Sequence, residues 1–389
     1  MYLDYINLVN KDITYDFRDL QIYDVTLRDG EQTPGVAFSV EEKLHIAKML
    51  NTFGIKYIEA GFPAVSEAEK VAVKKIVNLA LNSDIYGFCR LVKDDIDIAI
   101  NCGVKHIVLF FPGSSHMLES KMNLTFHEGL ERIKSIIDYA KKKNVYVRFG
   151  CEDASRTAFD KLLKMYNAAI DSGADMVTFA DTIGVMTPLA TYQLVKEIIN
   201  SISVPLAIHC HNDYGLGLAN TLSALEAGVK QVHVSINGLG ERAGNVSLEE
   251  FVMTLLIQYK TDFGYKLDYL YEMSEQVYKY AGLEVPFNKP IVGEKVFQHE
   301  SGIHVQGILK DPRTYQPFPA EIIGRKNEVI LGKHSGVSNI KYYIEKFKLT
   351  GLTEDKIQCA LKQIKHMAGR KEEINASKLL KMLTDLSVR

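Results

Sequence analysis

The sequence lacks any apolar run that approaches the roughly 20 consecutive residues needed to cross a bilayer. It also lacks the basic start and the small-residue cleavage site of a signal peptide, because acidic residues interrupt the short apolar pattern of residues 1–20. We therefore expect a chain that does not insert into a membrane and that works in the cytoplasm.

Paired cysteines and clustered positive charges are missing too. The five cysteines are an odd number without Cys-x-x-Cys spacing, which argues against a disulfide framework and against a thiolate zinc site. The formal net charge of -2 comes without a basic block, so the charged surface of a nucleic-acid-binding protein is not expected. A small molecule is the expected partner.

The remaining composition is that of a globular protein, with 47% hydrophobic and 24% charged residues. The length of 389 residues exceeds that of a usual single domain, although a barrel runs to about 250 residues as one unit. One barrel with an appendage is therefore a reasonable expectation.

One sequence pattern recurs in the first 240 residues: an amphipathic segment ends at a glycine, and a run rich in β-branched residues follows. We interpret each glycine as a helix C-cap and each run as a strand. The pattern occurs as Gly54-IKYIEAG, Gly103-VKHIVLFF, Gly173-ADMVTFAD and Gly228-VKQVHVSI. Further strand candidates are residues 21–27, 84–90, 144–151 and 204–210.

The eight strand candidates alternate with helix-patterned stretches, which predicts a parallel sheet because parallel strands need crossover helices. Helix start signals support this pattern, with a capping box at Ser39 and with Thr187 before Pro188. Eight units favour a (β/α)8 TIM barrel. An open doubly wound sheet is the alternative, but no Gly-x-Gly-x-x-Gly motif follows the first strand candidate.

The alternation stops near residue 290. The following segment is rich in proline and glycine and is interpreted as an ordered connector, and from Ser335 onward the pattern is helical again. We therefore expect a catalytic barrel over residues 1–290, and a connector with a small helical subdomain over residues 291–389.

Unusual polar residues gather where the predicted strands end, which is where barrel enzymes carry their chemistry. These groups lie at residues 28–32, 152–153, 181–182, 209–213 and 237–245. We therefore expect the active site at this end of the barrel.

His209 and His211 are two residues apart, so the strand period of two points both imidazoles to one face. With one carboxylate, for which Asp29 is the best candidate, they would form a metal site with open positions for substrate and water. Open positions indicate catalysis. The alternative is a chance pair that faces solvent or a helix.

Three other residues each have a functional and a structural interpretation. Arg28 could hydrogen-bond a carbonyl oxygen that becomes an alkoxide, or form a salt bridge. Glu152 could be a general acid or base, or pair with Arg156. Asn245 could be a further metal ligand, or only shape its glycine-rich turn.

Taken alone, four more residues favour structural roles. Glu241 and Arg242 could be just an ion pair. His304, in the segment HESGIH, is interpreted as a structural histidine, and Tyr315 as ordinary packing in the connector.

Eight segments nevertheless carry a family resemblance. They are YDVTLRDGEQTPGV (23–36), IEAGFPAVS (58–66), EDASRT (152–157), FADTIGVMTP (179–188), HCHNDYGLGLANTLSALEAG (209–228), NGLGERAGN (237–245), HESGIHVQGILKDPRTY (299–315) and LGKHSG (331–336). Together they resemble the acyl-CoA-dependent 2-oxo-acid condensing enzymes, namely the isopropylmalate, homocitrate and citramalate synthases of the barrel metallolyase superfamily. The last two segments narrow the resemblance from the superfamily to these synthases.

The resemblance implies a divalent metal, which could be Zn, Mn or Mg, held by Asp29, His209 and His211 with Asn245 near it. It implies that a 2-oxo acid chelates the metal and that Arg28 polarises the keto oxygen. The implied reaction removes a methyl proton from acetyl-CoA, adds the enolate to the ketone and hydrolyses the thioester.

Further roles come from the same resemblance. Thr182 matches the position that binds the substrate carboxylate, and Gln32 is expected to bind substrate as well. Glu152, His304 and Tyr315 match the acid/base group. The resemblance implies that His304 reaches the site from the partner subunit of a homodimer, which replaces its structural interpretation.

The identity of the 2-oxo acid depends on the fifth strand candidate. Arg148 points to the same face as Gly150 and Glu152, and it matches an arginine that homocitrate synthases use near the distal carboxylate of 2-oxoglutarate. Gly150 departs from the serine often found there, and Phe88 replaces a histidine seen in the lysine-pathway enzymes. The substrate contacts of those enzymes therefore carry over only in part.

We also expect no C-terminal regulatory domain of the kind usual in leucine-inhibited isopropylmalate synthases, because the chain continues only briefly after LGKHSG. The sequence thus favours homocitrate synthase. Isopropylmalate, citramalate and Re-type citrate synthases are the alternatives within the class, and a C–C lyase or a non-enzymatic sensor are the alternatives outside it.

Overall fold

The computed structural model describes residues 15, 17–372 and 374–388, and it contains two compact units. The first unit ends at Glu284 and the second begins at Val285, close to the expected boundary at residue 290. Within the described residues, no helix has the length and apolar character needed to cross a membrane.

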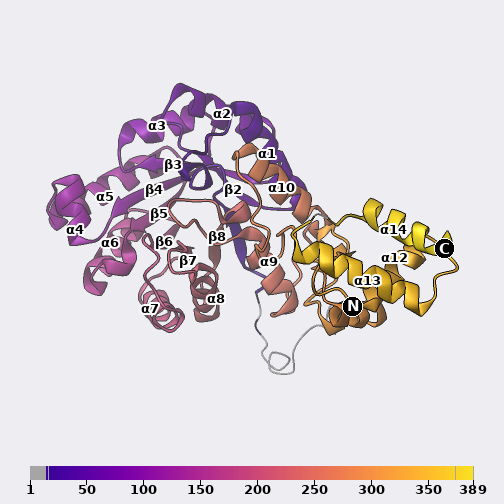
Figure 1. Ribbon diagram of the computed structural model, residues 1–389. Coiled ribbons are helices and arrows are strands. Elements are labelled where there is room, and N and C mark those ends of the chain that lie inside the picture. Colours follow the sequence, from indigo (N-terminus) through magenta and orange to yellow (C-terminus); the bar gives the residue numbers. More distant parts are fainter. Residues whose placement is uncertain (1–14, 16, 373, 389) are drawn as a thin grey trace. The chain divides into compact units, whose positions relative to one another are not determined.

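The first unit is a closed barrel of eight strands in chain order, as expected from the sequence (Figure 1). All neighbouring pairs are parallel, and pairs such as Gln21 with Gln231 and Asp24 with Val234 close the ring between the first and last strands. The strands are β1 (Gln21–Asp24), β2 (Tyr57–Gly61), β3 (Asp84–Arg90), β4 (His106–Pro112), β5 (Tyr146–Glu152), β6 (Met176–Asp181), β7 (Leu206–Cys210) and β8 (Gln231–Val234).

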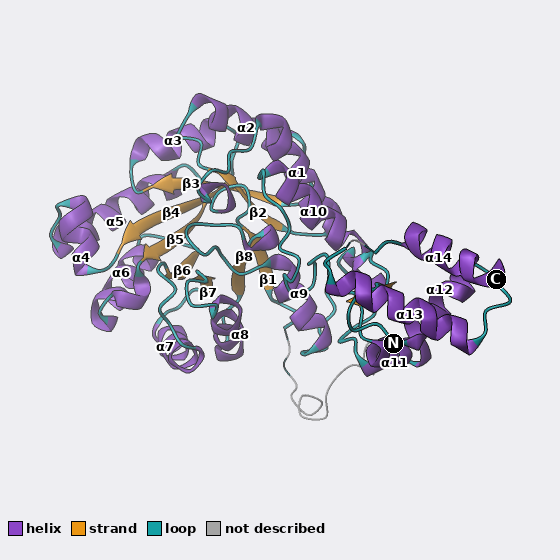
Figure 2. Ribbon diagram, in the orientation of Figure 1, coloured by secondary structure: helices purple, strands orange, loops and turns teal. Residues whose placement is uncertain are grey.

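Helices surround this barrel and cover its outer face (Figure 2). They are α1 (Val40–Phe53), α2 (Glu67–Asn78), α3 (Lys93–Asn101), α4 (Ser115–Met117), α5 (Phe126–Lys142), α6 (Phe159–Asp171), α7 (Pro188–Ser201), α8 (Gly217–Ala227), α9 (Leu248–Ile257) and α10 (Leu270–Tyr280). A π-helical turn, Leu118–Met122, follows α4 directly.

The predicted helix ends have local causes in the sequence. Ser39 and Glu42 form a reciprocal capping box at the start of α1, and Gly54 ends this helix in the left-handed conformation with φ 116°. Gly228 ends α8 in the same way, with φ 112°. Thr187 occupies the N-cap of α7 before Pro188, but its side chain makes no capping hydrogen bond.

The second unit has its own apolar core, built around helices α12 (Val337–Lys346), α13 (Glu354–Gly369) and α14 (Ala376–Val388). These match the helical pattern of the sequence. The connector contains one helix that the sequence analysis did not anticipate, α11 (Gly302–Lys310), and two short paired strands, β9 (Gln298–His299) and β10 (Glu328–Val329). Glycines at both 302 and 307 weaken the helical signal of α11.

Ser39→Ala removes the side chain that accepts a hydrogen bond from the Glu42 amide. We expect the barrel to lose about 1 kcal/mol of unfolding free energy, as is usual for an N-cap. The measurement is urea unfolding followed by circular dichroism. The matched control is Ser135→Ala, whose exposed hydroxyl only contacts a carbonyl one turn earlier in α5, and an equal loss in the control would contradict the capping argument.

Candidate active site

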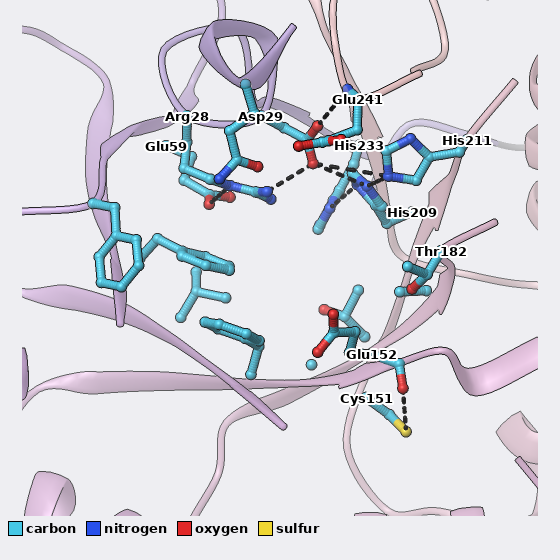
Figure 3. Close-up of a pocket in the computed structure, with 18 of the residues that line it drawn as sticks. Arg28, Asp29, Glu59, Cys151, Glu152, Thr182, His209, His211, His233 and Glu241 are labelled. Atoms are coloured by element: carbon cyan, nitrogen blue, oxygen red, sulfur yellow. Dashed lines mark hydrogen bonds and ion pairs between the residues drawn. The ribbon is translucent and has the colours of Figure 1, made fainter. Parts of the chain in front are cut away.

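A cavity of about 500 Å³ lies at the C-terminal ends of the barrel strands (Figure 3). Every strand of the barrel, or the turn that follows it, contributes to its wall. The expected site residues found in this wall are Arg28, Asp29, Gln32, Glu152, Thr182, His209 and His211. The remaining expected residues, Asn245, Arg148, His304 and Tyr315, are not part of the wall and are described below.

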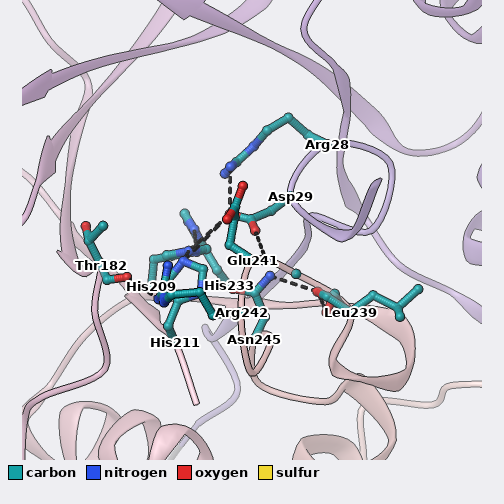
Figure 4. A network of polar contacts seen from close by, with 12 residues as sticks. Arg28, Asp29, Thr182, His209, His211, His233, Leu239, Glu241, Arg242 and Asn245 are labelled. Atoms are coloured by element: carbon teal, nitrogen blue, oxygen red, sulfur yellow. Dashed lines mark hydrogen bonds and ion pairs between the residues drawn. The ribbon is translucent and has the colours of Figure 1, made fainter. Parts of the chain in front are cut away.

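Asp29, His209 and His211 form a compact group of buried ligand atoms (Figure 4). The Asp29 Oδ2 atom lies 3.4 Å from His209 Nε2 and 3.9 Å from His211 Nε2. The two Nε2 atoms are 3.2 Å apart. β7 delivers His209 and continues to His211, while Asp29 comes from the turn after β1, so barrel closure brings the three together.

These spacings fit a divalent metal ion. Ligand atoms at 2.0–2.1 Å from a tetrahedral ion lie about 3.3 Å from one another, which is close to two of the three observed separations. Two imidazoles with one carboxylate form a donor set that binds Zn²⁺ and other first-row divalent ions. The group can therefore hold such an ion and leave part of its coordination sphere open.

Asn245 lies next to this group, opposite His211 in an isolated antiparallel bridge. Its Nδ2 donates to the Leu239 carbonyl at 2.9 Å, while its buried Oδ1 has no hydrogen-bond partner among the described residues. A Cβ atom at Gly240 would lie 2.3 Å from the Asn245 amide nitrogen and 3.1 Å from Asp29 Oδ1. Glycine at 240 thus lets the amide approach the ligand group.

The ionisation states suit metal binding. Burial raises the pKa of Asp29, but Arg28 and His209 lower it more, so it stays well below its usual range and the group is a carboxylate. Burial, with His209 beside it, lowers the pKa of His211 to about 4. A neutral imidazole with a free lone pair is the form that binds metals.

Arg28 is held beside the ligand group by two acids. Its Nε donates to Glu59 Oε1 at 2.5 Å and one terminal nitrogen donates to Asp29 Oδ2 at 2.7 Å. Its guanidinium also lies 4.2 Å above the Phe88 ring. The salt bridge that the sequence left open is therefore present, and it fixes the cation at the edge of the cavity.

Arg148 lies in the barrel interior, with no exposed surface and outside the cavity wall. One terminal nitrogen contacts Gln231 Oε1 and lies 3.0 Å from His233 Nε2, and the other lies 3.7 Å from Glu59 Oε2. Its guanidinium stacks 3.7 Å from the Tyr23 ring. Gly150 and Glu152, further along β5, reach the wall itself.

Three buried residues of the wall with polar or charged side chains were missed by the sequence analysis: Glu59, Thr178 and His233. All are buried, and the Thr178 hydroxyl has no hydrogen-bond partner among the described residues. They lie within the strands β2, β6 and β8, whereas the search weighed residues after strand ends. A polar residue inside an otherwise apolar strand run was the signal that could have found them.

Two possible ion pairs have different partners from those considered. Arg156 pairs with Asp153 at 2.8 Å, and Glu152 instead borders both the main cavity and a neighbouring one of about 400 Å³. Arg242 binds Asp213 at 2.7 Å and also donates to the Thr182 carbonyl.

His304 and Tyr315 belong to the second unit, where they contact each other. Their rings stack with centroids 4.1 Å apart, and both side chains are exposed. Gly307 makes the contact possible, because a Cβ atom there would lie 2.8 Å from the Tyr315 ring. The second unit thus presents these two side chains as one exposed pair.

Comparison with known proteins identifies the family of this chain. A family model described as HMGL-like matches residues 19–277, and one described as homocitrate synthase post-HMGL domain-like matches residues 291–372. The homocitrate synthase AksA of Methanothermobacter thermautotrophicus is 45% identical over 95% of both chains. A probable 2-isopropylmalate synthase of Methanopyrus kandleri is 44% identical over 90% of this chain and 70% of its own.

Among solved structures, hydroxymethylglutaryl-CoA lyase from Pseudomonas aeruginosa superposes with a TM-score of 0.61. It is 23% identical and covers 68% of this chain and 94% of its own, a likeness that concerns the barrel fold. The matches over both units agree with the resemblance that the eight sequence segments carry. The chain is therefore an enzyme of the HMGL-like family, in the branch of the acyl-CoA-dependent condensing transferases that includes the homocitrate and 2-isopropylmalate synthases.

Proposed function

We propose that this enzyme is a homocitrate synthase, which joins acetyl-CoA to 2-oxoglutarate. A carbon–carbon bond forms between the acetyl methyl carbon and the keto carbon, the methyl proton goes to a base, and the keto oxygen gains a proton. Water then cleaves the thioester and releases the CoA thiol. Relatives named homocitrate synthase that are 42–46% identical over most of the chain support this choice.

The observation that carries the choice of substrate is the buried guanidinium of Arg148. Its Nε and one terminal nitrogen have no hydrogen-bond partner among the described residues, although the side chain has no exposed surface. Unsatisfied buried donors are costly, and a second carboxylate on the substrate would satisfy them. Gly150 carries no side chain between this layer and the cavity wall, which leaves room for a substrate chain to reach it.

Asp29, His209 and His211, with Asn245 beside them, would hold the divalent metal, for which Zn, Mn and Mg are the candidates. When bound, the metal would supply Lewis-acid polarisation of the ketone. Arg28 would hydrogen-bond the keto oxygen as it gains negative charge, since Glu59 and Asp29 fix its guanidinium at the edge of the cavity. Thr182 and Gln32 would bind the substrate from the wall.

Proton transfer is assigned to Glu152 together with His304 and Tyr315. Glu152 lines the cavity, and the other two form the exposed stacked pair of the second unit. We assign the pair to the active site of the partner subunit in a homodimer. A base close to the acetyl methyl group lowers the barrier to enolate formation.

The first test is a thiol-release assay with acetyl-CoA and a panel of 2-oxoglutarate, 2-oxoisovalerate, pyruvate and oxaloacetate. We expect the highest kcat/KM with 2-oxoglutarate, and loss of thiol release after metal removal with a chelator. Turnover of 2-oxoisovalerate without turnover of 2-oxoglutarate would show that the chain is an isopropylmalate synthase instead. Turnover of pyruvate or oxaloacetate alone would point in the same way to the corresponding synthase.

Arg148→Met keeps an apolar chain in the barrel but removes the donors for a second carboxylate. We expect kcat/KM for 2-oxoglutarate to fall by about 10- to 100-fold, the range for charge-assisted hydrogen bonds, with a smaller fall for a monocarboxylic 2-oxo acid. Steady-state kinetics on both substrates measures the difference. Equal losses on both would remove Arg148 from the specificity argument.

Mixed dimers test whether the site is shared. Asp29→Asn and His304→Ala should each abolish activity alone, because each damages both sites of a homodimer. If His304 serves the partner's site, unfolding and refolding the two variants together should restore about a quarter of wild-type activity, since every mixed dimer regains one intact site. Variants that stay inactive after verified subunit exchange would place His304 in its own subunit's site, or outside any site.

A further inference from the structure

His233 lies between a proposed metal ligand and the proposed specificity residue. Its Nδ1 lies 3.3 Å from Nδ1 of His209, and its Nε2 lies 3.0 Å from a terminal nitrogen of Arg148. The ring is 4% exposed and packs against Tyr23, with centroids 4.6 Å apart. Both of its nitrogens are therefore occupied by neighbours.

The hydrogen-bond directions along this chain are fixed at one end, because arginine can only donate. Arg148 donates to His233 Nε2, so a neutral His233 carries its proton on Nδ1 and donates it to His209 Nδ1. His209 then carries its own proton on Nε2, which faces Asp29 Oδ2 and His211 Nε2. All three hydrogen bonds point from the arginine towards the ligand group.

A bound metal ion would reverse this chain. His209 would offer its Nε2 lone pair to the ion, so its proton would move to Nδ1 and be donated to His233. His233 would then carry its proton on Nε2, which faces the Arg148 nitrogen, and two donors would meet. The two neutral rings hold two protons before and after, and in each ring the proton changes nitrogen.

The donor that faces His233 Nε2 must then turn away. The same nitrogen of Arg148 keeps its contact with Gln231, whose own amide donates to Gln21 Oε1 at 2.8 Å and so fixes the orientation of its oxygen. The other nitrogens of Arg148 have no hydrogen-bond partner among the described residues, and the layer above includes the side-chain-free Gly150. With the Gln231 contact kept, the guanidinium would rotate and turn these nitrogens towards the substrate cavity.

We propose that His233 is a positioning residue that couples metal binding to the release of Arg148, so that the metal-loaded site is the form that receives a dicarboxylic 2-oxo acid. This inference rests on the metal ligands and the Arg148 role of the proposed function. By linkage, Arg148 must oppose metal binding to the same extent that metal binding releases Arg148.

The test is the Zn²⁺ affinity of the full chain without substrates, measured by competition with a chromophoric chelator. His233→Leu removes the acceptor for the His209 proton and should weaken Zn²⁺ binding by about 10-fold, the lower end for an outer-shell partner. Arg148→Met removes the opposing donor and should strengthen binding by about fivefold, as expected for one hydrogen bond. In the double variant, adding Arg148→Met to His233→Leu should leave the Zn²⁺ affinity of the His233→Leu variant unchanged.

Two results of the Zn²⁺ measurements would overturn the proposal. If Arg148 only repels the ion by its charge, Arg148→Met will strengthen Zn²⁺ binding equally with and without His233, and this result would overturn the proposal. Unchanged or weaker Zn²⁺ binding by Arg148→Met would also overturn it. Tyr23→Phe is the matched control, because it alters the same layer but neither hydrogen bond of His233, and its affinity should equal that of the wild type.

If His233→Leu does not fold, ¹⁵N spectra of the histidine-labelled wild type decide the question. Zn²⁺ should move the His233 proton from Nδ1 to Nε2, and an unchanged protonation pattern would refute the coupling. None of these measurements uses acetyl-CoA or a 2-oxo acid. A failure of the substrate prediction is therefore distinguishable from a failure of this one.

Discussion

The buried charge cluster of Arg28, Asp29, Glu59 and Arg148 is the constraint on which the rest of the site depends. Two guanidinium groups and two carboxylates share the barrel interior, where an unpaired charge would be strongly disfavoured. Glu59 lies between both arginines and contacts each of them. The fold must keep all four together, and the ligand set and cavity wall are built around them.

Barrel closure brings the residues of this cluster and the ligand group together within a single chain. The first and last strands pair in register, so that Asp29 after β1 meets His209 on β7 and His211 just after it, while His233 lies on β8 next to His209. Glycines then remove side chains where groups must approach closely, as Gly240 does beside Asn245. The geometry of the site is thus a consequence of strand order, with local space created by glycine.

The sequence predicted the eight strands and the residues after strand ends, because period-two runs and glycine caps are local signals. It could not show that Arg148 lies in a layer below Gly150 and Glu152, since alternation gives the face of a side chain but not its depth in a barrel. It also missed Glu59 and His233. Their importance comes from neighbours on other strands, which only the three-dimensional arrangement identifies.

In the proposed function, this layering would separate the residues that react from the residue that selects the substrate. The wall around the cavity contains the ligand group, Arg28 and Glu152, which any 2-oxo acid would meet through its keto acid end. Selection among 2-oxo acids must act on the rest of the substrate, beyond the keto acid end. In the wall, the stacked rings of Phe88 and Phe110, 4.4 Å apart, carry no charge that could bind a second carboxylate. In the proposed function, a positive charge held one layer deeper would therefore distinguish a dicarboxylate without changing the chemistry above it.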